Sequence, residues 1–164
     1  MGRAIDNPIS GERIVIRVTG AETGGELLAF DLYLPPGTSV PARHVHPIQE
    51  EQFTVVDGRL RFSVGRTTLV ADPGDTVRVP SGTAHWFENA GSTTAHARVE
   101  VRPALRMEEL LETSGSLGRA RLPDLAQLLL DYQREIAAPF IPAPVMRAVL
   151  RPIAWFARRR AVAP

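Results

Sequence analysis

The sequence contains no cysteine and no lysine, and all 19 of its basic residues are arginines. Without cysteine, the chain has no thiol nucleophile, no disulfide and no thiolate ligand for a metal. Without lysine, it cannot form a Schiff base with a carbonyl substrate, and it lacks the phosphate-binding lysine of a Walker motif. These absences exclude thiol catalysis, Schiff-base chemistry and Walker-type nucleotide binding.

The sequence also has little excess charge and no long hydrophobic run. The net charge of +1 is far from the strong basic excess of a nucleic-acid-binding domain, so we expect no nucleic-acid partner. The N-terminal residues carry no apolar stretch behind a basic start, so we expect neither a signal peptide nor a membrane span. The 164 residues, 44% of them hydrophobic, suit one globular domain with an appendage. We therefore expect a cytoplasmic protein.

Short segments rich in β-branched and aromatic residues fill the first two thirds of the chain, with Gly, Pro and Asp between them. These segments predict strands at residues 14–18, 27–34, 52–56, 60–64, 67–71, 76–79, 85–88 and 97–101. The turns between them include Asp57-Gly58 and Pro80-Ser81-Gly82. Many short strands at close spacing predict an all-β core, a sandwich or a small barrel.

The pattern changes to helical after Arg102. Helices are predicted at residues 107–112, 125–132 and 144–160, and Asp124 can cap the first turn of the second one. Pro152 lies inside the third segment and removes a backbone donor, so we expect a kink there or two shorter helices. We therefore divide the chain into a β domain at residues 1–103 and an α-helical C-terminal extension at residues 104–164.

Three histidines and one carboxylate form a candidate metal site: His44, His46, Glu51 and His85. Side chains alternate faces in an extended segment, so His44 and His46 point the same way, and Glu51 can return on an adjoining stretch. A lone strand histidine is more often a surface or hydrogen-bonded residue, and His96 is interpreted in that way. His44, His46 and His85 lie at positions that can converge, so a surface or hydrogen-bonded role is a weaker interpretation for these three.

The spacing of these residues resembles the two motifs of the cupin family. The first motif runs from Gly37 through His44-Val45-His46 to Glu51, with Gly58 following, and it has one extra residue between Gly37 and His44. The second fits at every defined position, with its residues at Gly74, Pro80, Gly82, His85 and Asn89. The motifs cover residues 37–89, and the flanking strands extend the resemblance to residues 13–101.

The resemblance implies a small antiparallel jelly-roll β-barrel of a single-domain cupin, similar to the quercetinase-like members. The metal would be held at the barrel mouth by His44, His46, Glu51 and His85. Glu50 is the competing carboxylate, but Glu51 shares a face with Phe53 and Val55 and is expected to point inward. Asn89 is expected to fix a turn or to support a ligand.

These nitrogen and oxygen donors suit one divalent transition metal: Fe(II), Mn(II), Ni(II), Cu(II), Co(II) or Zn(II). Four protein ligands leave up to about two open positions on an octahedral ion, which favours a catalytic over a structural metal. The first hypothesis is a dioxygenase that binds an enolic or phenolic substrate beside dioxygen, with Glu51 accepting a proton. The alternatives are a non-oxidative cyclase or isomerase, resembling the polyketide-cyclase cupins, and a small-molecule-binding protein without turnover.

Inward positions on the strands predict an apolar lining for a small-molecule substrate, although such residues are core by default. The predicted lining consists of Phe30, Leu32, Phe53, Val55, Phe62, Val79 and Phe87. Cupins commonly dimerise, so the resemblance implies a homodimer in which the C-terminal helices cover the barrel mouth or contact the partner. The third helix, with Trp155 and the cluster Arg158-Arg159-Arg160, could also lie on a membrane surface, which is the weaker expectation.

Overall fold

Nine strands and three helices follow one another along the chain in a computed structural model that describes residues 3–8, 10–40, 42–117 and 121–161. The side chains of residues 156–161 lie outside the described part. The strands are β1 (Ala4–Asp6), β2 (Arg13–Val18), β3 (Leu28–Leu34), β4 (Glu50–Asp57), β5 (Leu60–Val64), β6 (Thr67–Ala71), β7 (Thr76–Val79), β8 (His85–Asn89) and β9 (Ala95–Arg102). All eight predicted strands are present, and β1 is additional.

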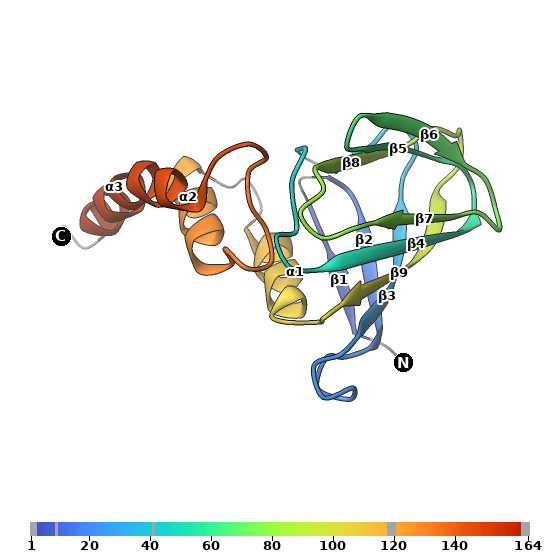
Figure 1. Cartoon of the computed structure of the whole chain (residues 1–164), viewed down its shortest axis with the longest axis horizontal. Coiled ribbons are helices and arrows are strands. Elements are labelled where there is room, and N and C mark those ends of the chain that lie inside the picture. The colour runs from blue at the N-terminus through green and yellow to red at the C-terminus, as the bar shows by residue number, and fades with distance from the viewer. Residues whose placement is uncertain (1–2, 9, 41, 118–120, 162–164) are drawn as a thin grey trace.

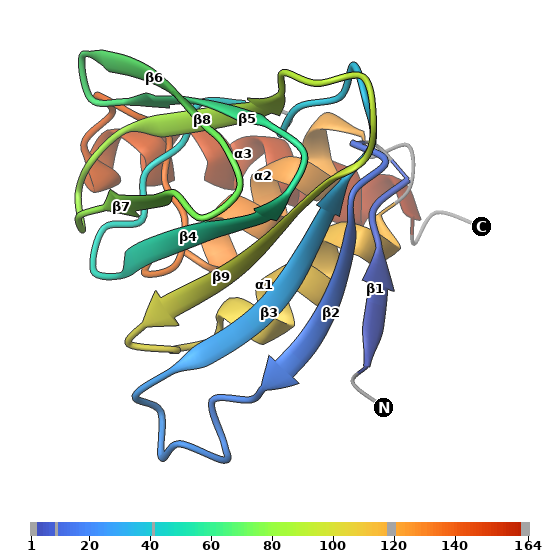
Figure 2. The ribbon, with the colours of Figure 1, turned by 90° about the vertical axis from the view of Figure 1, so that its right-hand side faces the viewer.

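The strands form two antiparallel sheets with the topology of a jelly roll. The larger sheet has the order β1-β2-β3-β9-β4-β7, and the smaller has the order β6-β5-β8. The segment at residues 38–40 runs along β8: Val40 N–H donates to Phe87 O, and Asn89 N–H donates to Thr38 O. Figure 2 shows β4, β9, β3, β2 and β1 side by side. The predicted jelly-roll fold is confirmed, but within the described residues hydrogen bonds do not close the two sheets into a barrel.

Strand alternation places the core between the sheets. Along β4, Glu51, Phe53 and Val55 are buried, while the residues between them are more exposed, as a strand with one face on a core requires. Phe53 packs against Phe62 and Phe87 with ring centroids 5.2 and 5.1 Å apart. Burying such rings contributes about 1.5–3 kcal/mol each, so this trio stabilises the contact between the two sheets.

The helices are α1 (Met107–Ser116), α2 (Leu122–Asp131) and α3 (Ala143–Ala161). Figure 1 shows them on one side of the sheets, with α3 farthest away. Helix α2 begins one turn earlier than predicted, so Asp124 caps it from inside the first turn by accepting a hydrogen bond from Arg121 N–H at 3.1 Å. Helix α3 is one element with Pro152 inside it, so of the two alternatives expected there, two shorter helices are excluded and a kink stays a prediction. In the described part of the chain, no helix is long and apolar enough to cross a membrane.

Candidate metal centre

Two of the candidate ligands face each other across a pair of main-chain hydrogen bonds. His44 N–H donates to His85 O at 3.0 Å, and His85 N–H donates to His44 O at 2.9 Å. The two motifs, separated by about forty residues in the sequence, are therefore joined at their ligands. A further bond, from Gly82 N–H to His46 O at 2.8 Å, ties the turn before β8 to the first motif.

The four predicted ligands converge on one point. Their potential donor atoms all lie within 4.8 Å of one another. Glu51 Oε2, which reaches the cluster from the start of β4, is 3.0 Å from His85 Nε2 and 3.3 Å from His46 Nε2. His46, Glu51 and His85 are buried, and His44 is half-buried.

Each of the three histidines directs Nδ1 at a main-chain carbonyl. The acceptors are Ala42 O for His44 at 2.9 Å, Thr83 O for His85 at 3.3 Å, and Glu135 O for His46. Because a carbonyl oxygen can only accept, Nδ1 carries the proton in each ring, and the lone pair of the neutral imidazole lies on Nε2. This is the tautomer that presents Nε2 to a metal ion.

The protonation states of Glu51 and His44 also suit a cation. Burial lowers the pKa of His44 to about 3, with added repulsion from His46 and His85. Burial opposes the charged form of His46 as well, but the Glu51 carboxylate outweighs it and raises the pKa of His46. Burial would raise the pKa of Glu51, yet His46 and His85 hold it well below its ordinary value. Glu51 is therefore anionic at neutral pH and His44 is neutral, as metal ligands must be.

The donor atoms fit a metal ion better than they fit each other. His46 Nε2, His85 Nε2 and Glu51 Oε2 are buried, and none has a hydrogen bond of normal geometry among the described residues despite their short separations. Such groups are costly to bury unsatisfied. Ligands about 2.0–2.2 Å from a metal and at right angles to each other are about 3 Å apart, which matches the separations around Glu51. The residues present can therefore hold one metal ion.

The neighbouring candidates fall where the sequence placed them. Glu50 points away from the cluster and lies 3.4 Å from Arg78, so Glu51 is the inward carboxylate. His96 lies in β9, outside the ligand cluster, and stacks on Tyr33 with a centroid separation of 4.4 Å.

Asn89 stabilises two connections of the chain and is not part of the ligand cluster. Its Nδ2 donates to Leu34 O at 2.7 Å and to Thr93 O at 2.8 Å, and its Oδ1 accepts from Gly91 N–H at 2.8 Å. The expectation that Asn89 fixes a turn is therefore confirmed.

Two residues that the sequence did not single out hold the ligand segments in place. Arg43, next to His44, donates to Ser63 Oγ at 2.6 Å, to Ala84 O at 3.1 Å and to Gly65 O. Gln49 is fully buried, and its Nε2 donates to Pro103 O at 3.0 Å and to Ala104 O at 2.9 Å. No local pattern marks either residue, because their partners lie 20 or more residues away.

The seven residues predicted to line a substrate pocket all belong to the buried hydrophobic core. Each is at most 6% exposed: Phe30, Leu32, Phe53, Val55, Phe62, Val79 and Phe87. Glu51 and Phe53 share the inner face of β4, so the trio of phenylalanines begins directly beside the ligands. Contact between these side chains and a substrate stays a prediction.

Residues 30–101 match the family model of the cupin domain. This segment contains all four ligands and the whole of β4, which carries Glu51, so the match covers the site itself. With the jelly-roll fold and the paired motifs, it shows that the chain contains a cupin domain.

Solved structures support the same fold. A "predicted oxalate decarboxylase" from Thermotoga maritima is 21% identical with a TM-score of 0.57, over 63% of this chain and 92% of that one. An RmlC-like cupin from Shewanella frigidimarina is 18% identical with a TM-score of 0.56, over 66% and 89%. A sugar phosphate isomerase of the cupin superfamily from Silicibacter pomeroyi is 21% identical with a TM-score of 0.54, over 62% and 71%. No curated protein matches the chain.

Proposed function

We propose that the protein is a metal-dependent enzyme that oxidises a small enolic or phenolic molecule with dioxygen. The observation that carries this proposal is the cluster of three histidines and one anionic glutamate, whose donor atoms lie within 4.8 Å of one another. When bound there, a divalent transition metal such as Fe(II), Mn(II), Ni(II), Cu(II) or Co(II) supplies Lewis-acid and redox chemistry at the positions that the protein leaves open.

The chain's own residues have distinct tasks in this proposal. His44, His46 and His85 hold the ion through Nε2, and their Nδ1–H groups keep the rings oriented. Glu51 contributes the negative charge, and one of its carboxylate oxygens accepts the proton of the substrate hydroxyl. The buried phenylalanines beside Glu51 keep water away from that proton transfer.

Within the part of the chain that the structure describes, the lack of a second buried carboxylate beside the histidine ligands supports an oxygenase. Among the described residues, the remaining buried carboxylates are bonded elsewhere: Glu12 to Asn7, Asp31 to Arg17, and Glu135 to the N–H of Arg106. Among the described buried carboxylates, only Glu51 lies in the cluster with His44, His46 and His85. A reaction that uses one base and draws its oxidising power from dioxygen fits this arrangement.

A non-oxidative isomerase or cyclase is the second candidate, since one of the similar structures carries the name sugar phosphate isomerase. In that reaction the metal would polarise a substrate carbonyl, and Glu51 would again move the proton. Binding of a small molecule without turnover is the third candidate.

Oxygen consumption separates these three functions. The protein is loaded with each of Fe(II), Mn(II), Ni(II), Cu(II), Co(II) and Zn(II) and mixed with a panel of catechols and flavonols in an oxygen-electrode cell. The proposal predicts consumption with at least one redox-active metal, loss of it in Glu51→Gln, and none with Zn(II). Product without oxygen uptake would favour the isomerase or cyclase, and tight retention of a ligand without product would favour the binding protein.

The proposal also includes a homodimer and a cytoplasmic location, which rest on the sequence. Apolar side chains exposed on the extension, among them Phe140, Val145 and Val149, support self-association.

A further inference from the structure

The segment that connects α2 to α3 crosses the cupin domain at the metal centre. Val45, which lies between the ligands His44 and His46, forms a two-way main-chain pair with Ala137: Val45 N–H donates to Ala137 O at 3.0 Å, and Ala137 N–H donates to Val45 O at 2.9 Å. Ala137 lies well outside residues 30–101, where the cupin model matches. The ligand segment thus pairs with His85 on one side and with the helical extension on the other.

The same connection supplies the acceptor for one ligand ring. His46 Nδ1 donates to the main-chain carbonyl of Glu135, while its Nε2 lies 3.3 Å from Glu51 Oε2. The corresponding acceptors of His44 and His85 are carbonyls only two residues away in the sequence. The orientation of His46, alone among the three histidines, therefore depends on a part of the chain 89 residues distant.

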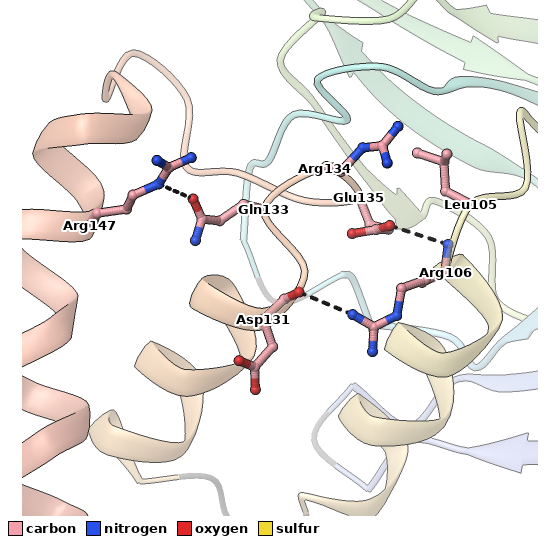
Figure 3. Close-up of a pocket in the computed structure, with 7 residues that line it drawn as sticks. All are labelled: Leu105, Arg106, Asp131, Gln133, Arg134, Glu135 and Arg147. Carbon is pink, nitrogen blue, oxygen red and sulfur yellow. Dashed lines mark hydrogen bonds between the residues drawn. The ribbon is translucent and has the colours of Figure 1, made fainter.

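The side chain of Glu135 is bonded at the start of the helical extension. Glu135 is 3% exposed, and its Oε1 accepts a hydrogen bond from Arg106 N–H, at the start of α1, at 3.2 Å. Figure 3 shows this bond beside two others at the same junction: Arg106 Nη1 donates to Asp131 O, and Arg147 of α3 donates to Gln133.

An open pocket lies along this junction. Its volume is about 320 Å³, and its lining includes Arg106, Glu135 and Arg147. Of the three hydrogen bonds at this junction, the one between Glu135 and Arg106 N–H is the least exposed.

We propose that Glu135 is a positioning residue of the metal centre. Its buried carboxylate fixes the α2–α3 connection on α1, and its main-chain carbonyl thereby keeps His46 in the Nδ1–H tautomer with Nε2 turned to the ion. The helical extension is then a working part of the metal site. This inference rests on the metal-binding part of the proposed function and is independent of its oxygen chemistry.

Three variants of the full chain test the inference by metal affinity. Glu135→Ala removes the carboxylate acceptor, and Glu135→Gln keeps an acceptor oxygen at the same place. Glu109→Ala is the control, because it breaks the exposed ion pair with Arg106 on the same helix and leaves the connection intact. The dissociation constant of Zn(II) is measured by competition with a chromogenic chelator. We expect it to rise about 10- to 100-fold in Glu135→Ala and to stay within about threefold of wild type in the other two.

The second measurement is the tautomer of His46 by ¹⁵N NMR on metal-free protein at alkaline pH, which a merely structural role for Glu135 would not move. The wild type is expected to show the Nδ1–H form, and Glu135→Ala a mixture of both forms. Wild-type affinity in Glu135→Ala would overturn the inference. If that variant does not fold, the wild-type spectrum decides, because a predominant Nε2–H form of His46 would overturn it. Neither readout involves turnover, so failure of the oxygen-consumption experiment leaves this test unaffected.

Discussion

Replacement of Arg43 by methionine tests how the first motif is held against the second. Methionine keeps an unbranched apolar stem and removes the donors to Ser63 Oγ, Gly65 O and Ala84 O. Hydrogen bonds from a charged donor contribute about 1.5–3 kcal/mol each. Arg43 is half-buried, so water replaces part of this contribution, and we expect a loss of about 2–4 kcal/mol in the free energy of unfolding.

The assay is urea unfolding of metal-free protein, with Zn(II) affinity measured on the same samples. Because Arg43 directly precedes His44, we expect the Zn(II) dissociation constant to rise about tenfold in Arg43→Met. Arg66→Met is the matched control, since Arg66 is an exposed arginine on the turn between β5 and β6. The control should stay within about 0.5 kcal/mol of wild type. If Arg43→Met were no less stable than Arg66→Met, Arg43 would not join the two motifs.

Two further predictions concern a turn and the pH dependence of the site. Gly58 and Gly37 have nearly the same positive φ, +75° and +72°, but a Cβ at Gly58 would lie 2.8 Å from the Cα of Ala95, whereas at Gly37 it would meet nothing within 4 Å. Gly37→Ala should therefore cost about 1–2 kcal/mol of unfolding free energy and Gly58→Ala about 2–5 kcal/mol; equal losses in urea unfolding would contradict this packing. In metal-free protein the raised pKa of His46 keeps its ring protonated at pH 6, so an incoming ion must displace that proton. Apparent Zn(II) affinity should fall about tenfold or more from pH 6 to pH 5, and a change of less than about threefold in a chelator competition would argue against this protonation.

The strands and the ligands could be predicted because their signals are local. Period-two alternation and turn residues determine where β4 and β8 lie, and the same alternation selects Glu51 over Glu50. Strand β1 gave no such signal, because it has three residues and only Ile5 is buried. Closure of the barrel also could not be judged, since it depends on hydrogen bonds between strand edges and not on side-chain pattern.

The contact between the helical extension and the metal centre could not be predicted from the sequence, because main-chain groups make it. Glu135 meets His46 through a main-chain carbonyl, and Ala137 meets Val45 through main-chain groups on both sides. Every residue has these groups, so no residue type or spacing marks the contact. In α3, Met146 and Ala154 are buried while Val145 and Val149 stay exposed.

The amount of metal bound per chain decides whether the four convergent side chains are a metal centre. Wild-type protein and a His44→Ala, His85→Ala double variant are purified without added metal, equilibrated with a slight excess of Zn(II) or Co(II), freed of unbound ion, and measured by elemental analysis. Circular dichroism confirms that both are folded. The structure predicts one ion per chain in the wild type and almost none in the variant. Equal, substoichiometric metal in both would show that His44, His46, Glu51 and His85 do not hold an ion.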